Sequence, residues 1–242
     1  MYKPFLEGDE ITSFGVNYKG RFLLYDPALL HRSRTPDVFE ENKIMIQRIT
    51  GGSKPIKAAF DNSGYYNKES ILNLQLLSDE FSYYYILALL NSSTINWFYK
   101  QKFTNNSKLT VNLSKEYLEQ IPIKKCDSLG QSALVIMGKL LSYSYKKKII
   151  FSVFYRILDA LVFNLYFPDH MKEREIDVLE FVERDMEQAL QGREFDSLSV
   201  PEKEKVIDQL HKTWSHSDNE VRNRIKLFAV RSPEILKPIL ES

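Results

Sequence analysis

The sequence predicts an α/β (α+β) fold, with a small mixed or antiparallel sheet and flanking helices, followed by a long helix and a helical C-terminal unit. Short segments rich in branched and aromatic residues, separated by Gly, Asn and Asp, fill the first part of the chain. Apolar residues then recur at helical spacing, and serine-based helix-start motifs follow toward the C-terminus. These changes divide the chain into predicted units at 1–125, 126–168 and 169–242.

The predicted strands lie at 21–25, 43–49, 56–60 and 71–76. Gly51-Gly52 and Asp61-Asn62-Ser63-Gly64 supply turn residues between and after them. Residues 78–103 then follow a helical pattern, which Asn91-Ser92-Ser93 interrupts and which therefore predicts a pair of helices covering the sheet. Aromatic residues at helical spacing usually pack in a core, so we interpret Tyr83-Tyr84-Tyr85 as core rather than as a base-stacking cluster.

The region 129–167 is long, free of proline and apolar on one side, which predicts a bracing helix or helices between the two units, or a partner-docking surface. Lys146-Lys147-Lys148 within it fits a solvated face better than a phosphate patch. In the tail, Ser199-x-x-Glu202, Ser217-x-x-Glu220 and Ser232-Pro233 each predict the start of a short helix.

Composition excludes several classes of protein. No run of about 18 apolar residues is present and the N-terminus lacks a signal-peptide pattern, so we expect a cytoplasmic protein without membrane contact. The single cysteine, Cys126, excludes an internal disulfide, and the four scattered histidines show no metal-ligand spacing. The net charge of +1 argues against a simple nucleic-acid binder, although residues 1–125 contain 16 Lys and Arg against 13 Asp and Glu.

Signatures of catalysis are missing. The chain has no Pro-Pro, no glycine-rich cofactor or phosphate loop and no GxSxG, so we expect no catalytic residues, cofactor or metal. Asp37, Glu41 and Lys43 have the residue types of the PD-(D/E)xK nucleases, which hold Mg²⁺ with carboxylates. Their spacing leaves no room for two strands and a turn, and favours a charged loop before a strand.

Five segments, in order, resemble the C-terminal specificity domain of Taq-type adenine DNA methyltransferases and combined restriction-modification enzymes. They are Lys3-Pro4-Phe5-Leu6-Glu7-Gly8-Asp9-Glu10-Ile11, Asn42-Lys43-Ile44-Met45-Ile46-Gln47-Arg48-Ile49, Ala58-Ala59-Phe60-Asp61 with Gly64-Tyr65-Tyr66, Leu89-Leu90-Asn91-Ser92, and Leu118-Glu119-Gln120-Ile121-Pro122-Ile123. Residues 157–167 are similar to the closing helix of such domains. Because the catalytic half of the family is missing and the chain starts inside a family motif, we expect an excised or truncated, non-enzymatic recognition part.

The resemblance implies that residues 1–125 read double-stranded DNA while a catalytic methyltransferase domain binds S-adenosylmethionine and flips out the adenine. Guanidinium, ammonium and amide groups in polar loops are the candidate DNA contacts. They are Arg32, Arg34, Arg48, Lys54, Lys57, Lys102, Asn105, Asn106 and Lys108. The alternative is a docking module for a nuclease or methyltransferase partner, which the near-neutral charge favours.

Overall fold

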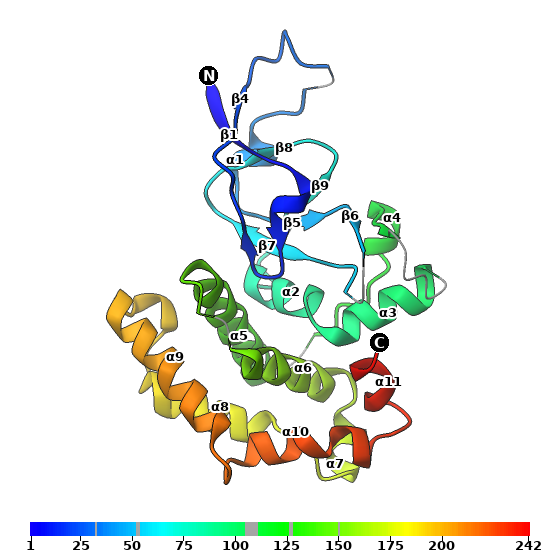
Figure 1. The fold of residues 1–242 in the computed structure, drawn as a ribbon, viewed down its shortest axis with the longest axis vertical. Coiled ribbons are helices and arrows are strands. Elements are labelled where there is room, and N and C mark those ends of the chain that lie inside the picture. The colour runs from blue at the N-terminus through cyan, green and yellow to red at the C-terminus, as the bar shows by residue number, and fades with distance from the viewer. Residues whose placement is uncertain (32, 52–53, 105–110, 126–127, 150) are drawn as a thin grey trace.

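The computed structural model describes residues 1–242 except 32, 52, 53, 105–110, 126, 127 and 150. It confirms the mixed α+β class, with strands in the upper part of Figure 1 and helices below them. The strands are β1 (Tyr2–Leu6), β2 (Ile11–Thr12), β3 (Gly15–Val16), β4 (Phe22–Leu24), β5 (Lys43–Gln47), β6 (Ile49–Thr50), β7 (Ala58–Asp61), β8 (Tyr66–Asn67), β9 (Ile71–Leu74) and β10 (Val111–Asn112).

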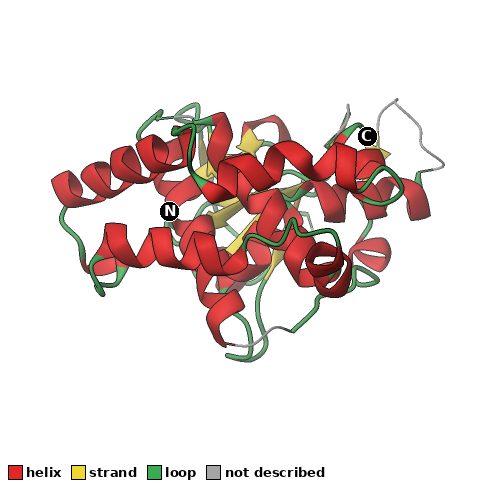
Figure 2. Ribbon diagram, turned by 90° about the horizontal axis from the view of Figure 1, so that it is seen from below, coloured by secondary structure: helices red, strands yellow, loops and turns green. Residues whose placement is uncertain are grey.

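The α-helices become longer toward the C-terminal half and lie across the strands when seen from below (Figure 2). They are α1 (Asp37–Glu40), α2 (Tyr83–Leu90), α3 (Ser93–Phe103), α4 (Lys115–Leu118), α5 (Ser128–Lys146), α6 (Ser152–Tyr166), α7 (Pro168–Glu173), α8 (Leu179–Leu190), α9 (Val200–Ser215), α10 (Glu220–Arg231) and α11 (Leu236–Leu240). Two 3₁₀ turns in the described chain are η1 (Gly8–Glu10) and η2 (Phe195–Ser197).

The central sheet has the strand order β7-β5-β9, with β5 antiparallel to both neighbours. Side chains alternate across β5, so Ile44 and Ile46 enter the main core while Met45 enters a smaller cluster with Leu6 and Ile71 on the opposite face. Both faces of this sheet are therefore covered. A second sheet, β4-β1-β8, pairs β1 antiparallel with β4 and parallel with β8.

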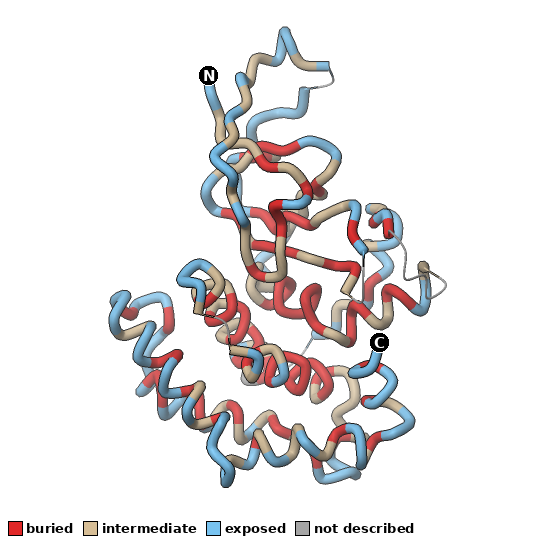
Figure 3. The backbone as a smooth tube through the Cα atoms, in the orientation of Figure 1, coloured by how far each residue is buried: buried red, intermediate tan, exposed pale blue. Residues whose placement is uncertain are grey.

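Helix α2 packs on β7 and on α5, and α6 packs in turn on α5. Buried positions concentrate along these helices and the central strands, whereas the loop between β4 and α1 is mostly exposed (Figure 3). The α2–α5 contact depends on Gly138, because a Cβ there would lie 2.5 Å from the carbonyl oxygen of Tyr84. The main core extends from β5 to α11, across the predicted boundaries near residues 125 and 168, which stay predictions.

The predicted pair of helices is confirmed, since Ser92 accepts a hydrogen bond from the backbone of Ile95 and begins α3. The tyrosine cluster is core: Tyr85 is buried, and Tyr83 and Tyr84 pack against Phe60. Among the described helices, none combines the length and hydrophobicity needed to cross a membrane.

The apolar stretch 129–167, predicted as a helix or helices, forms the two helices α5 and α6, and the turn between them places Lys148 at a left-handed φ of 58°. Two predicted helix starts in the tail require correction. Helix α9 has the predicted Ser199 capping box, but α10 is capped by Asn219 rather than Ser217. Ser232 accepts a hydrogen bond from the backbone of Leu236, so α11 begins later than the Ser232-Pro233 motif predicts.

Candidate nucleic-acid interface

Pairing of β6 with β10 brings together the described ends of two segments that the sequence predicts to be recognition loops. The strands are antiparallel, with Thr50 opposite Val111 and Ile49 opposite Asn112. The chain that follows Thr50 and the chain that precedes Val111 therefore leave this short ladder at the same end. Gly51 and Val111, at the ends of these two segments, therefore lie near each other, a juxtaposition that needs pairing across 61 residues.

Arg48 lies between β5 and β6, at the end of the β6–β10 ladder opposite to Gly51. Its Nε donates to Asn112 Oδ1 at 3.2 Å and its Nη1 lies 3.5 Å from the carbonyl oxygen of Glu69. A guanidinium carries five N–H donors, so these contacts leave donors facing solvent. Ile49 beside it is 56% exposed, an unusual position for a large apolar side chain in a strand. The pair offers a fixed cation next to an apolar contact surface.

Two neighbouring hollows share Lys68 and Glu69 in their linings, and Arg34 lines one of them. A cavity of about 920 Å³ includes Tyr25, Arg34 and Lys68 in its lining, and a neighbouring hollow of about 310 Å³ includes Ile49 and Lys68. Glu69, whose carbonyl faces Arg48, lines both. The loop after β4, the β8 region and β6 accordingly follow one another down the same side of Figure 1.

Lys68 is a candidate that sequence analysis missed. Its side chain is 56% exposed, lies 3.8 Å from Glu7 Oε1 and sits over the ring of Phe5 at 5.9 Å from the centroid. The signal available in the sequence was its place two residues after the Gly64-Tyr65-Tyr66 motif, but only the fold puts it in the lining of both hollows, with Arg34 in one and Ile49 in the other.

Lys54 and Lys57 lie in the segment before β7 and are half-buried. The charge of Lys54 acts on Asp159 of α6. Burial raises the pKa of Asp159, and the Lys54 charge and the Ser93 hydrogen bonds oppose this effect. Ser93 donates to Asp159 through both its backbone N–H and its hydroxyl, each at 2.7 Å. Lys54, one of the candidate DNA contacts, is therefore close enough to Asp159 for their charges to interact.

Lys102 is exposed near the end of α3, with its ammonium group over the rings of Phe98 and Phe103. Phe103 stacks on Tyr117 of α4 at 4.6 Å, which orients this helix end toward the loop that follows. The remaining candidates in that loop lie outside the described residues, as does one in the loop after β4. They are Asn105, Asn106, Lys108 and Arg32.

The nuclease-like residues do not assemble. Lys43 is fully buried, pairs with the carboxylate of Asp61 and donates to the carbonyl of Phe39, whereas Asp37 is exposed at the start of α1. A lysine so enclosed has no access to water or phosphate. Within the described ranges, no three His, Cys, Asp or Glu side chains are grouped to hold a metal ion.

The comparison that decides the family covers the half of the chain containing this surface. Residues 3–123 match the family of the TaqI-like C-terminal specificity domain. The chain belongs to this family. A comparison with curated protein sequences finds no match.

The segments that carry the family resemblance build the scaffold of this TaqI-like specificity domain. Glu10 is buried and accepts hydrogen bonds from the backbone of Glu7 and Lys19 and from Arg21. Burial acts to raise the pKa of Glu10, but these donors outweigh it and hold the pKa below its usual value. The carboxylate thus ties the turn after β1 to the start of β4.

Two asparagines attach the segment before β7 to the helix pair. Asn91 Oδ1 accepts from the backbone N–H of Ala58 at 3.1 Å, and its Nδ2 donates to the Ala58 carbonyl at 3.0 Å. Asn96 Oδ1 accepts from the backbone of Ile56 at 2.7 Å. These amides hold the strand-side end of the loop that starts at Gly51. The family segments thus contribute to the scaffold, and the candidate contact residues other than Arg48 lie outside them.

Proposed function

We propose that residues 1–125 form a sequence-specific DNA target-recognition domain of a restriction-modification adenine methyltransferase. The observation that carries the proposal is membership of the TaqI-like specificity family over residues 3–123. The β6–β10 pairing supports it, because it fixes the ends of two polar segments next to each other and DNA-reading side chains are commonly presented by loops on a rigid scaffold.

In this proposal Arg34, Arg48 and Lys68 face the duplex. A guanidinium reads guanine O6 and N7 bidentately or contacts phosphate, and a lysine ammonium neutralises phosphate without reading sequence. Arg48 is the strongest candidate for base readout, because Asn112 holds its Nε and Glu69 makes only a long contact of 3.5 Å with Nη1, so a guanine edge can compete for the terminal nitrogens. Ile49 supplies an apolar contact of the kind that suits a thymine methyl group.

The chain itself carries out no chemistry in this proposal. A separate catalytic domain binds S-adenosylmethionine and flips the target adenine out of the duplex, while this domain fixes which sequence is presented. The partners are double-stranded DNA and that catalytic domain.

The test is binding of the chain to duplex DNA across a range of salt concentrations, comparing wild type with Arg48→Ala and Lys68→Ala. Several phosphate contacts impose a linear fall of log affinity with log salt. Loss of a base-reading arginine costs about 1–3 kcal/mol and relaxes one position of the recognised sequence. Loss of a phosphate-binding lysine weakens all sequences alike and lowers the salt slope by about 1.

The near-neutral net charge of +1 favours a second candidate, a docking module for a methyltransferase or nuclease subunit. This module would show no salt-dependent affinity for DNA. The same titration, repeated with the catalytic domain added in trans, separates the two proposals.

A further inference from the structure

A cavity of about 380 Å³ lies where α6, α9 and α10 meet, in the helical part of the chain beyond the specificity domain. Its polar lining consists of side chains that donate hydrogen bonds or carry positive charge: Ser152, Arg156, His211, Ser215 and Arg222. No carboxylate of the described residues is part of the lining. The volume lies at the lower end of the range for small-molecule sites.

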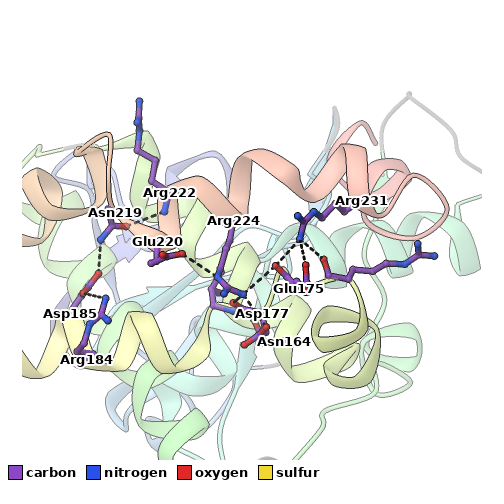
Figure 4. Close-up of polar contacts among 12 residues, drawn as sticks. Asn164, Glu175, Asp177, Arg184, Asp185, Asn219, Glu220, Arg222, Arg224 and Arg231 are labelled. Atoms are coloured by element: carbon purple, nitrogen blue, oxygen red, sulfur yellow. Dashed lines mark hydrogen bonds and ion pairs between the residues drawn. The ribbon is translucent and has the colours of Figure 1, made fainter.

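The two arginines of this lining have no side-chain partner among the described residues. Neither the Arg156 nor the Arg222 guanidinium makes a hydrogen bond or ion pair within the described chain. Other arginines of this half of the chain do engage carboxylates: Arg174, Arg184, Arg193, Arg224 and Arg231. Figure 4 shows the difference, because only the backbone N–H of Arg222 reaches Asn219, while its side chain extends away from the contacts that join α8 to α10.

The second half of the chain is not basic overall. Residues 126–242 contain 17 Lys and Arg against 19 Asp and Glu, so a cationic cavity free of carboxylates does not follow from general basicity. His211 is held at the wall by stacking on Phe151, with ring centroids 3.7 Å apart and planes 9° from parallel. Two forked guanidinium groups and hydroxyl donors around one hollow match the oxygens of a phosphate group.

We propose that this cavity binds a phosphate group, with Arg156 and Arg222 as the principal ligands and Ser152, His211 and Ser215 as further donors. The site is separate from the β6–β10 edge and does not depend on the DNA-recognition proposal. The phosphate belongs either to a small phosphorylated molecule or to the backbone of a nucleic acid that reaches the helical part.

Calorimetric titration of the whole chain with pyrophosphate, in chloride buffer of constant ionic strength, tests the proposal. Wild type is expected to bind pyrophosphate saturably, and Arg156→Gln and Arg222→Gln are each expected to weaken binding at least about tenfold, the order of one charge-assisted hydrogen bond. Arg222→Lys keeps the positive charge but loses the planar pair of donors, so its affinity for pyrophosphate should lie between those of wild type and Arg222→Gln. Lys226→Gln removes an exposed charge from α10 outside the cavity lining and should bind as wild type does.

Thermal unfolding of each variant shows that the fold is retained. Absence of saturable binding by wild type, or equal weakening in Arg222→Gln and Lys226→Gln, would overturn the proposal. A duplex-binding measurement with Arg222→Gln then identifies the source of the phosphate. A lower duplex affinity together with competition by pyrophosphate assigns the site to a nucleic-acid backbone, and an unchanged duplex affinity assigns it to a small phosphorylated ligand.

Discussion

Replacing Lys43 with methionine tests whether this residue belongs to a buried ion pair with Asp61 rather than to a nuclease site. The Lys43 side chain is 0% exposed and Asp61 is 1% exposed, so the substitution leaves a carboxylate buried without its cation. Breaking a buried ion pair by removing one partner costs about 3–5 kcal/mol. Asp61 keeps hydrogen bonds from the backbone of Ser63 at 2.8 Å and Tyr65 at 3.0 Å, which places the expected loss near the lower end, about 3 kcal/mol.

Asp61→Ala should cost more, about 5 kcal/mol, because it leaves the ammonium of Lys43 buried and also removes the acceptor that holds the turn after β7. The double variant Lys43→Met/Asp61→Ala should lose less than the sum of the losses in the two single variants, since neither charge remains unpaired. Urea unfolding followed by circular dichroism measures these differences. With a slope of about 3 kcal/mol/M, Lys43→Met should lower the midpoint by about 1 M.

A Lys43→Met protein with a free energy of unfolding within about 0.5 kcal/mol of wild type would refute the buried pair. Loss of a Mg²⁺-dependent DNA cleavage activity in a stably folded Lys43→Met variant would go further, because it would restore the nuclease interpretation.

Three other changes test separate parts of the account. Gly138→Ala should lower the free energy of unfolding by about 1–3 kcal/mol despite alanine's helix propensity, because its Cβ would meet the Tyr84 carbonyl; a more stable variant in thermal unfolding would contradict the close α2–α5 contact. Asp159→Ala should lose about 1–3 kcal/mol by leaving the Ser93 N–H without an acceptor, whereas Asp159→Asn should retain most of the stability. Since the folded pKa of Asp159 is raised above 3.8, its contribution to the free energy of unfolding is fully present below that pH and declines as the pH rises through the folded pKa. Asp159→Asn should lack this decline when urea unfolding is measured at stepped pH. Identical pH profiles for the two proteins would contradict the raised pKa of Asp159.

The sequence predicted the strands and helix starts that depend on residues close to one another in the chain. The strands around β4, β5, β7 and β9 were predictable from short branched and aromatic runs, and the α3 and α9 starts from serine caps. Two-residue strands such as β2, β3 and β8 carry too little pattern to be read from sequence. No proline in the sequence marks the break between α5 and α6, which coincides with the left-handed conformation of Lys148.

The candidate interface was predictable as residue types but not as an arrangement. Arg48 was a candidate because it sits in a polar turn, yet its contact with Asn112 required the β6–β10 pairing. The structure also separates, by their burial, residues that look alike in the sequence. Lys43 and Lys68 are both lysines within or beside family motifs, but one is enclosed with Asp61 and the other is largely exposed at the surface.

The most direct test of the central claim is selection of a random duplex DNA pool by this chain across a range of salt, alone and with the catalytic domain in trans. The account predicts enrichment of one asymmetric sequence, with affinity that falls steeply as salt rises. Enrichment should be relaxed at a single position by Arg48→Ala. Absence of binding at every salt concentration, with and without the catalytic domain, would contradict DNA recognition and leave the docking module as the function.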